Sequence, residues 1–161
     1  MLEHMPARSG VTMRTHDVFA IAHNLAARLG HSEVTSVHIL LAILREGRSP
    51  AVLALHNRGV RLKALEQDLE QHLPRSTAAF EADHVWTASD VAILHNAADE
   101  ARELGHEYQG CEHILLAMLR DPQSVPAVVL ARHEVRFRDA RAEVLRILGS
   151  PLSDNVDDLA G

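Results

Sequence analysis

The sequence predicts an all-α fold in which eight helices form two pseudo-symmetric four-helix repeats. The first observation is an internal repeat: Gly-His, six residues, then His-Ile-Leu-Leu-Ala begins at Gly30 and again at Gly105, 75 residues later. Further identities keep this offset from Thr12 to Leu73. Self-similarity at a fixed period is the sequence signature of a structural unit that is built more than once.

Composition is the second observation. Hydrophobic residues make up 47% of the 161 residues but aromatic residues only 3%. Alanine and leucine outnumber the β-branched and aromatic residues that strands prefer. A chain of this length can bury one shared core, so we expect the two repeats to pack into one body.

The first helix of each repeat is marked by its ends. Thr12 and Thr87 stand just before long helical patterns, where a hydroxyl can satisfy an unpaired backbone N–H. Asp90 gives the second start the form of a capping box. Both patterns end in Leu-Gly, so Gly30 and Gly105 are predicted to stop their helices in the left-handed conformation.

The remaining helices follow in the same order in each repeat. The second helices, predicted at 36–46 and 111–121, are apolar on nearly every side and belong at the centre of a core. A short third helix is expected after Ser49 and after Ser124, because each serine is followed closely by a proline. An amphipathic fourth helix closes each repeat, with apolar residues at spacings of three and four. These apolar positions are Leu62, Leu65, Leu69, Leu73 and Phe137, Ala140, Val144, Leu148.

The chain therefore divides into five parts. The repeats occupy 11–73 and 87–149, and a linker at 74–86 breaks the helical pattern with proline and polar residues. Residues 1–10 show no periodicity and are expected to be a disordered leader or one added for expression. Residues 150–161 form a polar, acidic linker or tail.

Composition also excludes several functions. The formal net charge is −6 and no basic stripe is present, which argues against a nucleic-acid partner. No run approaches 18 apolar residues and the N-terminus lacks the apolar centre of a signal peptide, so we expect a cytoplasmic protein with no membrane partner. Lys63, the only lysine, does not stand in Gly-Lys-Ser/Thr, so the chain has no phosphate-binding P-loop and is not itself an ATPase.

Residues 11–149 contain two copies of one pattern, Thr…Leu-Gly-His…His-Ile-Leu-Leu-Ala-(Ile/Met)-Leu-Arg. This double pattern resembles the N-terminal repeat domain of Clp-family AAA+ unfoldases, a double Clp-N motif, and most closely that of the ClpC branch. The stretch from Gly105 to Leu116 is close to the family's Gly-His-x-Tyr-Ile-Gly-Thr-Glu-His-Ile-Leu-Leu. The resemblance implies a domain without chemistry or cofactor that sits on a hexameric ATPase ring. Such a domain docks adaptors and substrates and passes them towards the unfolding pore and its peptidase. In isolation it is expected to be a monomer, because hexamerisation belongs mainly to the ATPase part.

The resemblance also implies a phosphoarginine site in each repeat. The helix-start Thr and a nearby Arg approach the phosphate, and the Glu before the motif His faces the guanidinium, in agreement with the chemistry of helix N-termini and carboxylates. The residues at these positions are Thr12, Arg14 and Val37 in the first repeat, and Thr87, Ser89 and Glu112 in the second. Val37 replaces the Glu and Ser89 replaces the Arg, so each site is expected to be half present. Weak binding that depends on Glu112 is expected in the second repeat.

The family's aromatic residue before the helix-start Thr is Val11 in the first repeat and Trp86 in the second. Trp86, beside Phe80, is a candidate wall of a shallow apolar groove for a peptide or a cyclic-peptide ligand. The alternative is that Trp86 packs as a hydrophobic staple at the helix entry.

The repeated histidines pose a choice between structure and chemistry. A metal site would draw its ligands from His106, Cys111, Glu112 and His113. The first repeat keeps His31 and His38 without the Cys and Glu, so the histidines are expected to fix the loop between the first two helices by hydrogen bonds, with no metal bound. Cys111 is the only cysteine, and its place at a helix start is expected to lower the pKa of its thiol. The sequence shows no third catalytic group and no glycine-rich oxyanion loop, so we do not expect Cys111 to act as a nucleophile.

The leading hypothesis is a protein-binding module that serves as the adaptor and substrate receptor of a Clp-type unfoldase. One alternative is a free-standing regulator or decoy that binds peptides, phosphoarginine or antibiotic cyclic peptides without a ring of its own. A metal-dependent enzyme that uses His106 and Cys111 is the alternative of another class.

Overall fold

The computed structural model describes residues 10–73, 85–86 and 88–149, and within them the predicted all-α class with eight helices is confirmed. The first repeat contributes α1 (Met13–Arg28), α2 (Ser36–Glu46), α3 (Pro50–Asn57) and α4 (Leu62–Glu70). The second contributes α5 (Ala88–Glu103), α6 (Cys111–Arg120), α7 (Val125–Arg132) and α8 (Phe137–Leu148). Leu73 lies beyond the end of α4 but still packs partly buried against the core.

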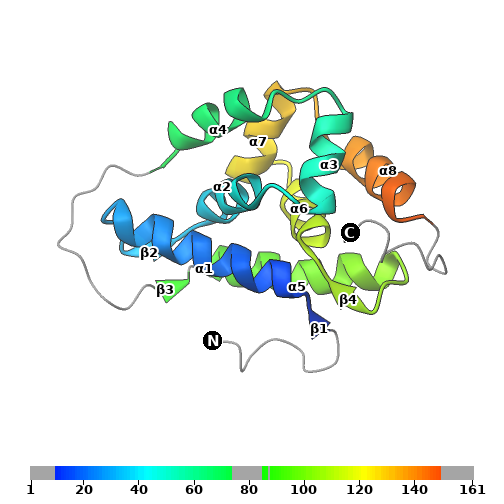
Figure 1. Ribbon diagram of the computed structural model, residues 1–161, viewed down its shortest axis with the longest axis horizontal. Helices are drawn as coiled ribbons and strands as arrows, with labels where there is room; N and C mark the ends of the chain where they lie inside the picture. The colour runs from blue at the N-terminus through cyan, green and yellow to red at the C-terminus, as the bar shows by residue number, and fades with distance from the viewer. Residues whose placement is uncertain (1–9, 74–84, 87, 150–161) are drawn as a thin grey trace.

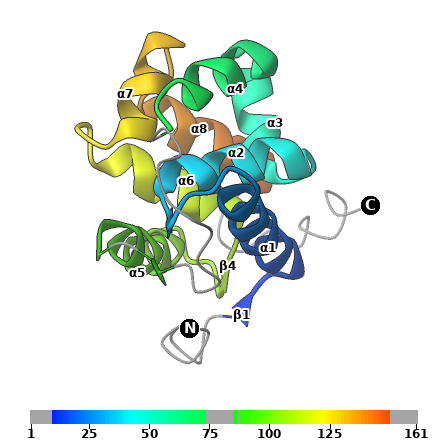
Figure 2. The ribbon, with the colours of Figure 1, turned by 90° about the vertical axis from the view of Figure 1, so that its left-hand side faces the viewer.

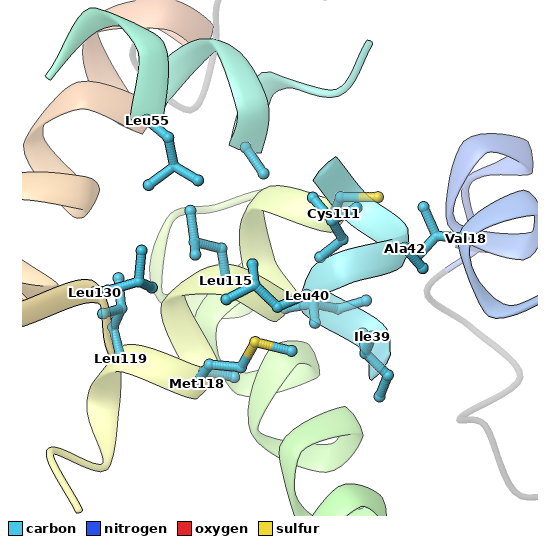
Figure 3. Packing of buried hydrophobic residues seen from close by; sticks show 14 of the residues in the cluster. Val18, Ile39, Leu40, Ala42, Leu55, Cys111, Leu115, Met118, Leu119 and Leu130 are labelled. Carbon is cyan, nitrogen blue, oxygen red and sulfur yellow. The ribbon is translucent and has the colours of Figure 1, made fainter. Parts of the chain in front are cut away.

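The helices form three levels around a central pair. Figures 1 and 2 show α2 and α6 in the middle, with α1 and α5 on one side and the shorter α3, α4, α7 and α8 on the other. This arrangement follows from composition, because α2 and α6 are apolar on nearly every side and every residue from Cys111 to Leu119 is buried. Figure 3 shows Leu40 of α2 and Leu115 of α6 in the middle of the buried cluster.

Local capping chemistry places the helix ends. The Oγ atoms of Thr12, Ser49 and Ser124 accept the backbone N–H of the residue three positions later, at 3.2, 3.4 and 3.3 Å. Each bond satisfies an N–H group that the first turn leaves unpaired. After α1 and α5 the chain turns through Gly30 and Gly105, whose φ angles of 72° and 74° favour a residue without a Cβ. The predicted cap at Thr87 lies outside the described residues.

Four two-residue strands, which the sequence analysis did not predict, link the repeats crosswise. β1 (Gly10–Val11), just before α1, pairs in parallel with β4 (Tyr108–Gln109), in the loop between α5 and α6. In the same way β3 (Val85–Trp86), just before α5, pairs in parallel with β2 (Glu33–Val34), in the loop between α1 and α2. Each repeat therefore lends its entry strand to the other repeat.

Polar contacts also join the repeats on the side of the shorter helices. Nδ2 of Asn57 donates to the Glu143 carboxylate at 3.1 Å, and the Asp68 carboxylate lies 2.6 Å from Nε2 of His133. The two repeats are thus held together at both ends of the core.

Among the described residues, no single helix is long and apolar enough to cross a membrane. The one pair that passes by combined length and composition, α6 with α7, is bent by 91°.

Candidate functional site

A cavity of about 420 Å³ opens where the strand exchange brings the two repeats together. The N–H of Thr12 donates to the carbonyl of Gln109 at 3.1 Å, so the start of α1 is fixed beside the start of α6. The wall of the cavity includes Thr12, Arg14, Glu46, Arg48, Ser49, Tyr108, Gly110 and Glu112. The N-termini of α1, α3 and α6 therefore border one space.

The helix N-termini place groups that attract anions at the wall of this cavity. Each carries unpaired N–H groups and the positive end of a helix dipole, and such ends attract anions. Arg14, in the first turn of α1, adds a formal positive charge. Its Nε lies 3.1 Å from the Glu46 carboxylate and its Nη1 donates to the carbonyl of Arg48 at 2.9 Å. A guanidinium has five N–H donors, so Arg14 is held in place with donors left for a ligand.

Glu112 places a carboxyl group in the same cavity. Its side chain is only 2% exposed, and it comes from the first turn of α6 in the second repeat. Burial raises the pKa of this carboxyl to about 7, although the charge of Arg14 acts in the opposite direction. Tyr108, in the wall beside it, interacts with the carboxyl group and also acts to lower the pKa of Glu112. A carboxyl group in the wall of a cavity can pair with a cationic group of a ligand.

The motif histidines form a relay behind the cavity. The N–H of Gly110 donates to Nδ1 of His113 at 2.9 Å, so Nδ1 carries no proton and Nε2 is the protonated nitrogen. Nε2 in turn donates to Nδ1 of His106 at 2.8 Å. Burial lowers the pKa of His113 to about 3, so the ring is neutral. Its contact with Glu112 at 3.7 Å is therefore not an ion pair at neutral pH.

The first repeat contains the same relay. The N–H of Thr35 donates to Nδ1 of His38 at 2.9 Å, and Nε2 of His38 lies 2.8 Å from Nδ1 of His31. In both repeats the histidine pair thus ties the start of the second helix to the end of the first. This geometry uses both ring nitrogens of His113 for hydrogen bonds.

The predicted effect on the thiol pKa of Cys111 was wrong. The helix start was expected to lower the pKa of its thiol, but burial at 1% exposure raises that pKa to about 12. Its Sγ lies 3.7 Å from the Thr15 hydroxyl in the interface between the repeats. The thiol is therefore protonated and packed rather than poised as a nucleophile. No group of three or more His, Cys, Asp or Glu side chains among the described residues is arranged to hold a metal ion.

The structure groups the predicted phosphate and guanidinium residues differently from the sequence analysis. The sequence analysis assigned Thr12 and Arg14 to one site and Glu112 to another, because it kept each site within a repeat. The structure brings these three residues to one cavity. Val37, which occupies the position of Glu112 in the first repeat, is buried and does not line it.

The second pair of strands, β2 and β3, brings the backbone before α5 to the loop between α1 and α2. β3 pairs with β2, in the loop that leads to α2. Thr87 lies outside the described residues, and the side chains of Trp86 and Ser89 are not described. The apolar groove predicted from Trp86 and Phe80 therefore stays a prediction.

Comparison with known proteins agrees with the duplicated architecture. A family model described as "Clp repeat (R) N-terminal domain" matches the chain twice, over residues 11–91 and 85–156. The chain belongs to the Clp repeat family. A curated relative, the "Negative regulator of genetic competence ClpC/MecB" of Bacillus subtilis, is 37% identical over 139 residues. That match covers 86% of this chain but 17% of the relative, so the chain spans about a sixth of the relative's length.

Solved structures share the Clp repeat fold. The Hsp104 N-terminal domain from Candida albicans has a TM-score of 0.74 at 16% identity, covering 88% of this chain and 93% of that one. A ClpV N-domain, solved as a complex with a VipB peptide, has a TM-score of 0.67 at 20% identity, covering 88% and 94%. Likeness at such identities shows the shared fold alone.

Proposed function

We propose that this chain is the receptor module of a Clp-type ATP-dependent unfoldase, and that it docks adaptor and substrate proteins without performing chemistry. The observation that carries the proposal is the cavity between the repeats, where Thr12, Arg14 and Glu112 meet. Family membership supports a place beside a Clp ATPase ring and its peptidase, and the ClpV N-domain solved with a VipB peptide supports peptide binding.

The ligand that best matches the cavity is phosphoarginine in a protein or peptide. Its phosphate would lie at the helix N-termini with Arg14, and its guanidinium would face the Glu112 carboxylate. Both contacts are charge-assisted, and guanidinium pairs with carboxylate through two parallel hydrogen bonds. The cavity therefore supports one complete site, in place of the two half sites expected from the sequence.

Phosphoarginine binding is expected to depend strongly on Glu112. Glu112→Gln keeps the shape of the side chain but removes its charge, and a hydrogen bond to a charged group contributes about 1.5–3 kcal/mol. We expect the Kd of free phosphoarginine to rise by roughly 10- to 100-fold, as measured by isothermal titration calorimetry. Binding is also expected to weaken about tenfold between pH 8 and pH 6, because only the ionised fraction of Glu112 is competent.

The control variant is Glu70→Gln, which removes a carboxylate that pairs with Arg45 well away from the cavity. This variant should bind phosphoarginine like the wild type. Free arginine and inorganic phosphate, tested separately, should both bind more weakly than phosphoarginine, because each fills only half of the cavity. Equal affinity of wild type and Glu112→Gln for phosphoarginine would exclude the proposed guanidinium contact.

A further inference from the structure

Gly110, at the N-cap of α6, lies directly beneath the carboxyl group of Glu112. Its φ and ψ of −110° and 177° are extended values that any residue adopts, so the backbone conformation does not require a glycine. A Cβ at this position would lie 2.6 Å from Oε2 and 2.7 Å from Cδ of Glu112. Real Cβ atoms do not approach other heavy atoms so closely, so the Glu112 carboxyl occupies the space that a side chain at residue 110 would fill.

The surroundings explain why this position of the carboxyl matters. The group is 2% exposed and its Oε1 lies 3.7 Å from Nδ1 of the neutral His113. Gly110 and Glu112 line the cavity with Thr12 and Arg14. A carboxyl pushed away from residue 110 would leave this place for the more open part of the cavity.

The first repeat offers an internal comparison at the same backbone geometry. Thr35, the N-cap of α2, has φ and ψ of −107° and 170°, close to those of Gly110. Its Oγ1 lies 2.9 Å from Nδ1 of His38, so a side chain is accommodated there. The residue that corresponds to Glu112 is Val37, which has no carboxyl. The glycine and the glutamate thus occur together in one repeat and are both missing from the other.

We propose that Gly110 is a positioning residue that holds the Glu112 carboxyl in the cavity and thereby sets its specificity for a guanidinium. Glycine at the N-cap and glutamate in the first turn act as a pair, and a carboxylate without the glycine does not make the site. The specificity for guanidinium rests on the proposed function, whereas the position of the carboxyl can be tested without any ligand.

The test uses Gly110→Ala and Gly110→Ser in the full chain, with Thr35→Ala as the matched control in the first repeat. Serine adds the same Cβ and is also a preferred N-cap, so loss of helix stability is separated from displacement of Glu112. The titration of the Glu112 carboxyl is followed by carbon-13 NMR, alongside the melting temperature and the affinity for free phosphoarginine.

In the wild type the Glu112 resonance should titrate near pH 7, in line with its raised pKa. In both Gly110 variants we expect the titration to move towards the ordinary value of 4.5 and the phosphoarginine Kd to rise at least tenfold. The melting temperature should be kept in Gly110→Ser and slightly lowered in Gly110→Ala, because alanine is a poor N-cap. Thr35→Ala should alter neither the titration nor the Kd.

The possible results separate the two proposals. An unchanged Glu112 titration in a folded Gly110→Ala or Gly110→Ser variant would overturn the positioning role, whatever the ligand does. A shifted titration in a protein whose wild type binds no phosphoarginine would uphold the positioning role and reject the proposed ligand.

Discussion

Leu115→Ala is expected to destabilise the protein by about 2–5 kcal/mol, the range observed when a buried leucine is truncated in a well-packed core. Leu115 is 0% exposed and belongs to α6, the helix that is buried from Cys111 to Leu119. The surrounding side chains come from both repeats (Figure 3), so a cavity there weakens the packing of the whole body. Urea unfolding followed by circular dichroism would measure the loss.

Leu53→Ala is the matched control for that prediction. Leu53 lies on α3 with 38% of its surface exposed, so the same truncation removes less buried area and leaves no enclosed cavity. Its free energy of unfolding should fall by about 1 kcal/mol or less. A similar loss for both variants would contradict the central place assigned to α6.

Glu112→Gln is expected to stabilise the fold at pH 8 while it weakens ligand binding. The pKa of Glu112 is raised from 4.5 to about 7 in the folded state, so the folded protein binds this proton more tightly than the unfolded chain. The resulting stability is fully present below about pH 4.5 and is lost as the pH rises through 7. The shift corresponds to about 3 kcal/mol, and glutamine, which mimics the neutral acid, avoids the loss.

The measurement is the difference in unfolding free energy between variant and wild type from pH 4 to pH 8. The unfolding free energy of the wild type alone does not isolate the effect of Glu112. Burial also lowers the pKa of His113 and of His106, and both histidines make stability rise with pH. They act in the same way in both proteins and cancel in the difference. The difference should grow in favour of Glu112→Gln as the pH rises. A difference that stays constant would show that Glu112 has an ordinary pKa in the folded state.

The helices and their order were predictable because the signals for them are local. Thr12, Ser49 and Ser124 cap helices within three residues of their own positions, and the apolar runs of α2 and α6 identify the centre without any knowledge of partners. The repeat offset also identified corresponding residues correctly. These features depend on spacings inside one segment, which a sequence displays directly.

The grouping of the site residues was not predictable in this way. Strands of two residues carry no periodicity, and the contact between Thr15 and Gln109 joins positions 94 residues apart. The pattern of replacements did contain a hint, because Arg14 and Glu112 keep the family's residues whereas Ser89 and Val37 replace them. Crosswise pairing of the strands brings Arg14 and Glu112 to one cavity.

The exchanged strands also constrain how such a fold could have arisen. Within the described residues each entry strand pairs with the other repeat, β1 with the loop of the second repeat and β3 with the loop of the first. A one-repeat ancestor would reach this architecture only as a homodimer in which each copy lends its N-terminal strand to its neighbour. Gene duplication and fusion would turn that swapped dimer into one chain. Its two equivalent ligand sites would then be free to diverge.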